Sequence, residues 1–170
     1  MIMPSVSVGD LAFPPYAHVP GRFPHPQSDP AGHHHTHPQV VPPEARFPWA
    51  LALFHAGFYW EAHEVWESLW RERPHGSAER FFLQGLIRLA ACGLKHREHR
   101  IDGILSHATG AARLFARSGQ DCFGLRVSDL LACCELAAVV PASFPDPEPL
   151  VRVVFSFVLV PDASPGASRP

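Results

Sequence analysis

The sequence has little charge and no long apolar run, and both shortages narrow the class of protein. Charged residues make up 18% of the 170 residues, and the formal net charge is only −2. Such a weak field offers little attraction for nucleic acid or for an acidic membrane surface, so we expect neither as a partner. The longest apolar run, residues 153–160 and interrupted only by Ser156, is far shorter than the roughly 20 residues that cross a bilayer. The N-terminus lacks the basic start and apolar stretch of a signal peptide, so we expect a soluble, cytoplasmic protein.

Several motifs that carry chemistry in other proteins are also missing. None of the four cysteines belongs to a C-x-x-C pair, and the neighbours Cys133 and Cys134 would point about 100° apart on a helix. We interpret all four as reduced thiols in an apolar core. The sequence contains no nucleophile elbow, phosphate loop or dinucleotide fingerprint.

Proline and histidine are abundant instead, and their uneven distribution divides the chain. Residues 1–47 are rich in proline and hold half of the 12 histidines. Because proline fixes φ and lacks an N–H donor, this stretch predicts an extended arm without long regular structure. Aromatic and aliphatic residues such as Phe13, Tyr16, Val19 and Phe23 would anchor the arm. We expect a helical bundle domain over residues 48–160 and a disordered tail over residues 161–170.

Hydrophobic periodicity and capping residues predict the elements of the bundle. A sharp turn at Gly57 separates the first two helices, Ser77 caps the third and Asp129 caps the fifth. The apolar, β-branched residues 150–160 predict one short extended segment. The predicted fold is therefore all-α, a small multihelical bundle with a Pro/His-rich extended N-terminal arm and a C-terminal extended segment. The five predicted helices span residues 49–55, 59–73, 78–95, 99–117 and 129–140.

The second predicted helix mixes tryptophans with acidic residues. On a helical wheel, His63 and Glu67 lie at the edge of the apolar face, whereas Glu61 and Glu64 lie on the polar face. We expect these last two glutamates to be solvated or salt-bridged. Trp60 falls in the middle of the polar face, which indicates that the arm or a second subunit covers it. We therefore expect a homodimer.

The third predicted helix is apolar on nearly every side, which is typical of a central helix. Its polar residues, Gln84, Arg88 and Lys95, form one narrow stripe. A salt bridge from Arg88 to Glu64 or Glu67 would satisfy part of this stripe.

His63 and Glu67 are four residues apart, so their side chains meet on one helical face. Three interpretations remain open: a buried hydrogen-bonded pair, a metal-free acid–base site, or a site for a divalent transition metal. In the last case His63 and Glu67 would be joined by arm histidines such as His25 and His33. A di-iron bundle is disfavoured, because no Glu precedes His63 by three residues. The candidate pocket residues are Glu61, His63, Glu64, Glu67, Trp70, Gln84 and Arg88.

A histidine tract, H-H-H-T-H at residues 33–37, lies within the arm. It has two interpretations. A mobile loop with an adventitious run of histidines explains it without any function. A metal shuttle or sensor is the alternative, since such tracts bind transition metals.

The run F-H-A-G-F-Y-W-E-A-H-E-V-W-E-S-L-W at residues 54–70, followed by F-L-Q-G-L-I-R-L-A and G-A-A-R-L, resembles a prokaryotic family of unknown function, catalogued as number 309. The arm is similar to that of one bacterial branch, so the resemblance covers roughly residues 13–117. It implies a small all-α bundle and no established activity. Family members often have an uncharged polar residue at the position of Arg88, so no uniform ligand role is implied there. The matching positions are Phe54, Gly57, Glu61, His63, Glu64, Glu67, Trp70, Gln84 and Gly85.

These observations predict a small helical-bundle protein with a polar pocket at the E-A-H-E-x-W-E helix. We expect the pocket to bind a ligand or a partner. The alternative is a metal-dependent hydrolase that uses His63, Glu67 and arm histidines, and whether the protein is an enzyme stays open.

Overall fold

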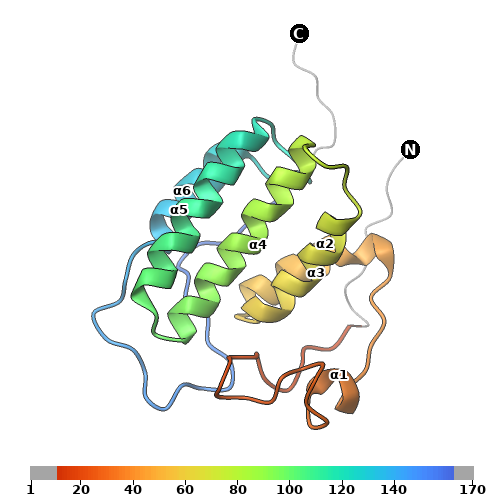
Figure 1. The fold of residues 1–170 in the computed structure, drawn as a ribbon, viewed down its shortest axis with the longest axis vertical. Helices are drawn as coiled ribbons and strands as arrows, with labels where there is room; N and C mark the ends of the chain where they lie inside the picture. The colour runs from red at the N-terminus through yellow and green to blue at the C-terminus, as the bar shows by residue number, and fades with distance from the viewer. Residues whose placement is uncertain (1–10, 163–170) are drawn as a thin grey trace.

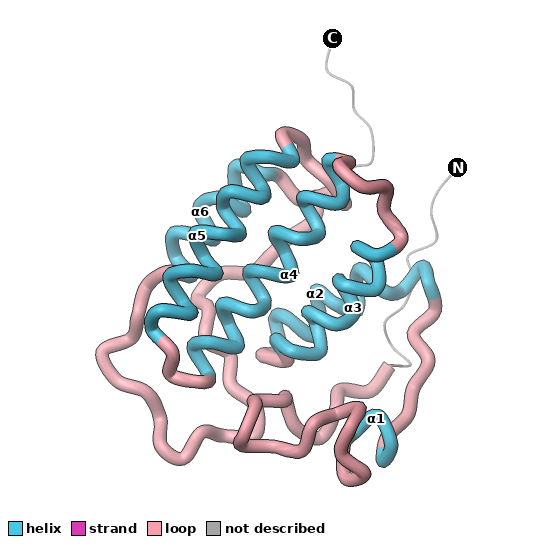
Figure 2. Tube along the Cα trace, in the orientation of Figure 1, coloured by secondary structure: helices cyan, strands magenta, loops and turns pink. Residues whose placement is uncertain are grey.

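The computed structural model describes residues 11–162, and within them the chain forms a helical bundle (Figure 1). A 3-10 turn at Pro43–Ala45 leads directly into the helix α2, which begins at Arg46. Figure 2 shows helices and loops, without strands, in this part of the chain. The predicted all-α fold is confirmed. The helices are α1 (His33–Thr36), α2 (Arg46–His55), α3 (Tyr59–Arg71), α4 (Ala78–Arg97), α5 (Ile101–Ser118) and α6 (Val127–Ala137).

Helix α4 is the central element, as its apolar sequence predicts. It packs against α3 on one side and α5 on the other. The side chains of Phe82, Leu86 and Leu89 are fully buried between them. Close packing also depends on Gly93, because a Cβ atom there would lie 2.6 Å from the ring of Tyr59 on α3. Ser77 caps the helix by accepting a hydrogen bond from the backbone N–H of Arg80, as predicted.

The turn between α2 and α3 depends on Gly57, which has φ of +89°. Only glycine adopts this conformation without steric cost. A Cβ atom at Gly57 would also lie 2.6 Å from the carbonyl oxygen of Arg152, so the corner packs tightly against the C-terminal segment. The predicted corner is confirmed, although α2 begins at Arg46 rather than at Trp49.

The start of α6 differs from the prediction. The helix begins at Val127, and Asp129 lies inside its first turn, where it pairs with Arg126 instead of capping. The carboxylate of Asp121 accepts a hydrogen bond from the backbone N–H of Val127 at 2.8 Å. A residue outside the helix therefore satisfies its first turn, which the local sequence pattern does not reveal.

Arg97 links the arm to the segment that follows α6. Its guanidinium is 1% exposed and forms an ion pair with Glu148 at 2.8 Å. It also donates hydrogen bonds to the carbonyl oxygens of Ala17 in the arm and Pro149 in the C-terminal segment. In Figure 1 the two segments run across the same end of the bundle. One buried cation thus holds two segments that are distant in sequence.

The C-terminal segment lies on α2 and α3 without forming a helix, which agrees with the predicted extended segment. The backbone N–H of Val154 donates to the hydroxyl of Tyr59, and that of Leu159 donates to Nε2 of His55, both at 2.9 Å. Most of the predicted disordered tail, residues 163–170, lies outside the described residues. All four cysteines are buried and free, as expected.

Candidate functional site

The arm covers the face of α3 that carries Trp60. The rings of His18 and His25 each lie 5.3 Å from the Trp60 ring, and His34 lies near its other edge. The unexpected tryptophan on the polar face is therefore packed under arm histidines. Burial lowers the pKa of His18, so this ring favours its neutral form beneath the arm.

Glu61 is buried under the same arm, which corrects the expectation of an exposed residue, although its contact with His33 has the geometry of a salt bridge. Its side chain is only 5% exposed. Oε1 accepts a hydrogen bond from the backbone N–H of His18 at 2.8 Å and another from Nε2 of His33 at 3.0 Å. Oε2 is equally buried but has no hydrogen-bond partner among the described residues. A buried carboxylate oxygen left unpaired is costly, so this atom marks the site.

Helix α1 positions His33 for this contact. The histidine tract folds into a single helical turn at His33–Thr36, and the side chain of His33 is buried. Its backbone N–H donates to the hydroxyl of Tyr16, which in turn donates to the carbonyl oxygen of Pro24. Burial raises the pKa of Tyr16, so the phenol stays protonated and keeps its donor. His33 therefore packs against α3, and the adventitious and metal-binding interpretations of the tract both stay predictions.

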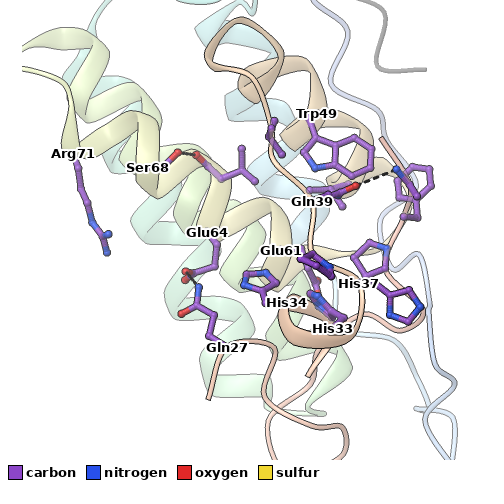
Figure 3. A pocket seen from close by; sticks show the side chains of 17 residues that line it. Gln27, His33, His34, His37, Gln39, Trp49, Glu61, Glu64, Ser68 and Arg71 are labelled. Atoms are coloured by element: carbon purple, nitrogen blue, oxygen red, sulfur yellow. Dashed lines mark hydrogen bonds and ion pairs between the residues drawn. The ribbon is translucent and has the colours of Figure 1, made fainter. Parts of the chain in front are cut away.

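A cavity of about 700 Å³ opens between the arm, α2 and α3. Figure 3 shows Glu61 among the side chains of His33, His34 and His37 in this cavity, with Trp49 on the far side. Glu64 also lines it and accepts a hydrogen bond from Gln27. The cavity therefore combines two carboxylates and the guanidinium of Arg71 with imidazole rings and apolar surface. The apolar and aromatic lining residues are Ala12, Phe13, Pro14, Pro38, Val41, Trp49, Leu53 and Val65.

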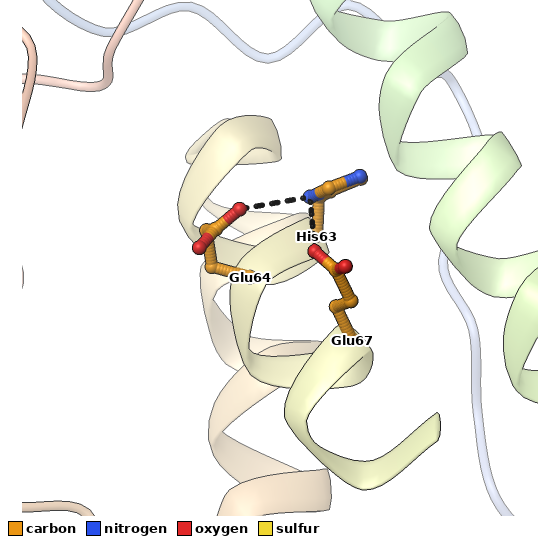
Figure 4. A group of neighbouring side chains, drawn as sticks. All are labelled: His63, Glu64 and Glu67. Carbon is orange, nitrogen blue, oxygen red and sulfur yellow. Dashed lines mark ion pairs between the residues drawn. The ribbon is translucent and has the colours of Figure 1, made fainter. Parts of the chain in front are cut away.

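His63, Glu64 and Glu67 form a second cluster on α3 (Figure 4). Nδ1 of His63 lies 3.3 Å from Oε1 of Glu64 and 4.0 Å from Oε2 of Glu67. The approach of His63 lowers the pKa of Glu64, which keeps that carboxylate ionised. Nδ1 is shielded from solvent and has no well-aligned hydrogen bond among the described residues. One imidazole nitrogen and two carboxylate oxygens, all within 4.8 Å of one another, have the chemistry of a metal site.

The arm histidines do not join this cluster. His33 contacts Glu61, and His25 lies against Trp60 while its Nδ1 accepts hydrogen bonds from the backbone. The reason is helical geometry, because two residues along a helix turn the side chain by about 200°. The arm covers the face of Glu61, whereas His63 points to a different face.

The other sequence candidates lie elsewhere. The Trp70 ring packs beneath the guanidinium of Arg80, 3.9 Å from its centroid. Gln84 and Arg88 line a separate depression of about 540 Å³ between α4 and α5. The expected salt bridge from Arg88 to Glu64 or Glu67 is not formed in the described part of the chain. Glu67 pairs instead with Arg71, at 2.8 Å on its own helix.

His107 on α5 is a polar residue that sequence reasoning missed. Burial, reinforced by the nearby charges of Arg88 and Lys95, lowers its pKa. Glycines make this arrangement possible, since Cβ atoms at Gly103 and Gly110 would overlap the side chains of Lys95 and Arg88. The spacing of these glycines around His107 is a sequence signal that could have located it.

The fold and the site together define an all-α bundle protein with a buried carboxylate under an N-terminal arm. Residues 47–106 match a family described as a domain of unknown function (DUF309), which confirms the resemblance over this segment. The match lies within α2 to α5 and leaves out the arm, whose likeness to one branch stays a prediction. No curated protein and no solved structure matches the chain. Within residues 11–162, no helix is long and apolar enough to cross a membrane.

Proposed function

We propose that this protein binds a small organic ligand in the cavity beneath its arm. The observation that carries the proposal is the buried carboxylate of Glu61, which lines a cavity of about 700 Å³ and has one oxygen without a partner. Pockets for small ligands commonly have volumes of roughly 300–1,000 Å³, mostly apolar walls and a few fixed polar groups. The apolar walls and the two carboxylates of this cavity match that description.

The arm supports the proposal because it orders the site before any ligand arrives. His18 and His33 hold Oε1 of Glu61 in place, so the carboxylate has little freedom left to lose on binding. Arg97 anchors the same arm at Ala17. A preorganised polar group inside an apolar cavity favours binding of a specific ligand over non-specific binding of apolar molecules.

A matched pair of cavity-filling variants tests the proposal. Ser68 lines the cavity, whereas Ser106 is an exposed residue of the separate depression on α5. A library of fragments with about 10–20 non-hydrogen atoms is screened by ligand-observed NMR against the full chain. We expect fragments that bind the unaltered protein and Ser106→Phe to lose binding to Ser68→Phe. Fragments that bind all three proteins equally, or a screen without hits, would contradict the proposal.

A divalent metal site at His63, Glu64 and Glu67 is the second candidate. It is supported by three ligand atoms that all lie within 4.8 Å of one another. Nitrogen and carboxylate ligands of this kind suit zinc or manganese. The corresponding enzyme proposal is a metal-assisted hydrolase in which Glu64, rather than an arm histidine, completes the ligand set with His63 and Glu67.

The metal proposal is tested on tag-free protein with Zn²⁺ and Mn²⁺ in titration calorimetry. Glu67→Gln is expected to remove one bound equivalent, whereas Glu72→Gln, an exposed glutamate just beyond the same helix, should keep it. Equal stoichiometry for both variants would show that the metal binds elsewhere, for example at the histidine tract. An assay for hydrolase activity follows only if the calorimetry shows that metal binds at His63, Glu64 and Glu67.

A homodimer remains a separate proposal. The homodimer was predicted because Trp60 lies on a polar face and needs a cover. The arm histidines provide that cover. The remaining support for a homodimer is the exposure of two apolar residues on α5, Ile101 and Leu105, which a second copy of the chain could cover. Sedimentation velocity over a hundredfold range of concentration would detect the dimer, and a constant monomer mass would exclude it.

A further inference from the structure

We infer that the ligand of the cavity beneath the arm is an organic amine, whose ammonium group binds Oε2 of Glu61. This inference rests on the proposed function and adds the chemical class of the ligand. A carboxylate oxygen with no partner, on a side chain that is 5% exposed, calls for a hydrogen-bond donor. An ammonium group supplies three donors and the opposite charge.

The other contacts of Glu61 leave this oxygen free for a ligand. The described donors, the His18 backbone N–H and Nε2 of His33, both reach Oε1. The nearby guanidinium of Arg71 is occupied by Glu67 at 2.8 Å, and it is not among the partners of Glu61. The chain therefore holds the carboxylate by one oxygen and leaves the other available.

The charges that line the cavity also favour a cation. The carboxylates of Glu61 and Glu64 line it, whereas the guanidinium of Arg71, which also lines it, is paired with Glu67. Burial lowers the pKa of His34, which favours the neutral form of this lining imidazole. An ammonium group would bring a further positive charge to these carboxylates, which a neutral or anionic ligand of the same shape would not.

The aromatic residues that line the cavity indicate the chemical character of the rest of the ligand. The rings of Phe13 and Trp49 lie 5.1 Å apart and line the cavity. Such surfaces accept an apolar or aromatic body, and aromatic faces also attract cations. The predicted ligand is thus an amine joined to an apolar group. Because Oε2 is shielded from solvent, the ammonium group reaches it only after a small shift of the side chains around it, while the contacts of Oε1 keep the carboxylate in place.

Three probes that differ in a single terminal group test the inference. Tryptamine, tryptophol and indole-3-propionate share an indole body and end in a cation, a neutral hydroxyl and an anion. Their affinities for the full chain are measured by titration calorimetry at pH 7. We expect the amine to bind about tenfold to a hundredfold more tightly than the alcohol, since hydrogen bonds to charged groups are the stronger kind. The acid is expected to bind most weakly.

Glu61→Gln is the diagnostic variant, because it keeps the shape and the acceptor for His18 but removes the charge. It is expected to abolish the preference for the amine while leaving the affinity for the alcohol within about twofold. Glu72→Gln removes one equal charge from an exposed position and should leave the preference intact. If Glu61→Gln fails to fold, the three probes on the unaltered protein still decide the question.

The outcomes separate the inference from the proposed function. If the alcohol or the acid binds as tightly as the amine, and Ser68→Phe abolishes that binding, the cavity binds ligands but the amine inference is overturned. If the amine preference survives Glu61→Gln, the inference is also overturned. If Ser68→Phe leaves the binding of every probe unchanged, or none binds, both the proposed function and the inference fail for these ligands.

Discussion

Nε2 of His33 lies 3.0 Å from Oε1 of Glu61, although 28 residues separate them in sequence. Both side chains are buried, at 4% and 5% exposure. Through this contact one turn of the arm completes the surroundings of a carboxylate on α3.

The first prediction concerns this contact. His33→Ala should lower the free energy of unfolding by about 1–3 kcal/mol, because it removes one of the two donors to a buried carboxylate oxygen. Urea unfolding followed by circular dichroism measures the change. His37→Ala, an exposed histidine of the same tract, should cost less than about 0.5 kcal/mol. Equal effects of the two changes would show that the His33 contact does not stabilise the arm.

The second prediction concerns Arg97. Arg97→Met should destabilise the protein by about 3–5 kcal/mol, because Glu148 would lose a buried partner and three carbonyl groups would lose a donor. Arg126→Met serves as the control. Arg126 is 57% exposed and pairs with an equally exposed Asp129, so its loss should cost less than about 1 kcal/mol. Thermal and urea unfolding of both variants would measure the difference, and similar losses would contradict the assigned role of Arg97.

The third prediction compares two glycines with positive φ. Gly76→Ala meets no atom within 4 Å and should cost only the conformational penalty of about 1–2 kcal/mol. Gly57→Ala adds an overlap with the backbone at Arg152, which should raise the cost to about 2–5 kcal/mol. Denaturant unfolding of the two variants measures this gap. A Gly57→Ala variant no less stable than Gly76→Ala would mean that the C-terminal segment does not pack on this corner.

The fourth prediction concerns pH. Burial lowers the pKa of His55 below its ordinary 6.5, and its Nε2 must stay unprotonated to accept the N–H of Leu159. As the pH falls through 6.5, the unfolded chain takes up the proton first. Stability is therefore complete above that pH and declines towards the lower folded pKa.

His55→Gln isolates this effect, because the amide oxygen of glutamine can accept the same hydrogen bond without titrating. Melting temperatures between about pH 7.5 and about pH 5.5 should fall less steeply for this variant than for the unaltered protein. His75→Gln, an exposed change, should leave the slope as it was. An unchanged slope for His55→Gln would show that other histidines with lowered pKa values, such as His18, His96 and His107, carry the effect.

Local patterns were enough to predict most of the fold. The central position of α4 follows from its nearly continuous apolar surface, and the corner at Gly57 follows from a residue that tolerates positive φ. The start of α6 was predicted wrongly, because Asp121 satisfies its first turn from six residues away. Helix order and type are encoded within short windows, whereas such caps depend on how a loop folds back.

The candidate site was less predictable, for the same physical reason. Trp60 indicated that the polar face of α3 is covered, and the arm does cover it. Yet the helical wheel placed Glu61 on the exposed polar face, as a solvated or salt-bridged residue, because burial of that carboxylate depends on His18 and His33, 43 and 28 residues away. A helical wheel describes which residues share a face but not which distant segment lies on it. His107 was missed because its charged neighbours come from another helix.

The buried guanidinium of Arg97 has a consequence for the order in which the chain matures. It bonds to Ala17 and to Pro149, and the backbone N–H of Ala17 also donates to Leu150. During synthesis on the ribosome, the arm emerges long before the residues that hold it in place. The helices can therefore form first, but the hydrogen bond between the arm and the C-terminal segment forms only after residue 150 has left the exit tunnel. Until then the arm lacks the hydrogen bond from Ala17 to Leu150, and its contacts through His18 and His33 are what hold it over Glu61.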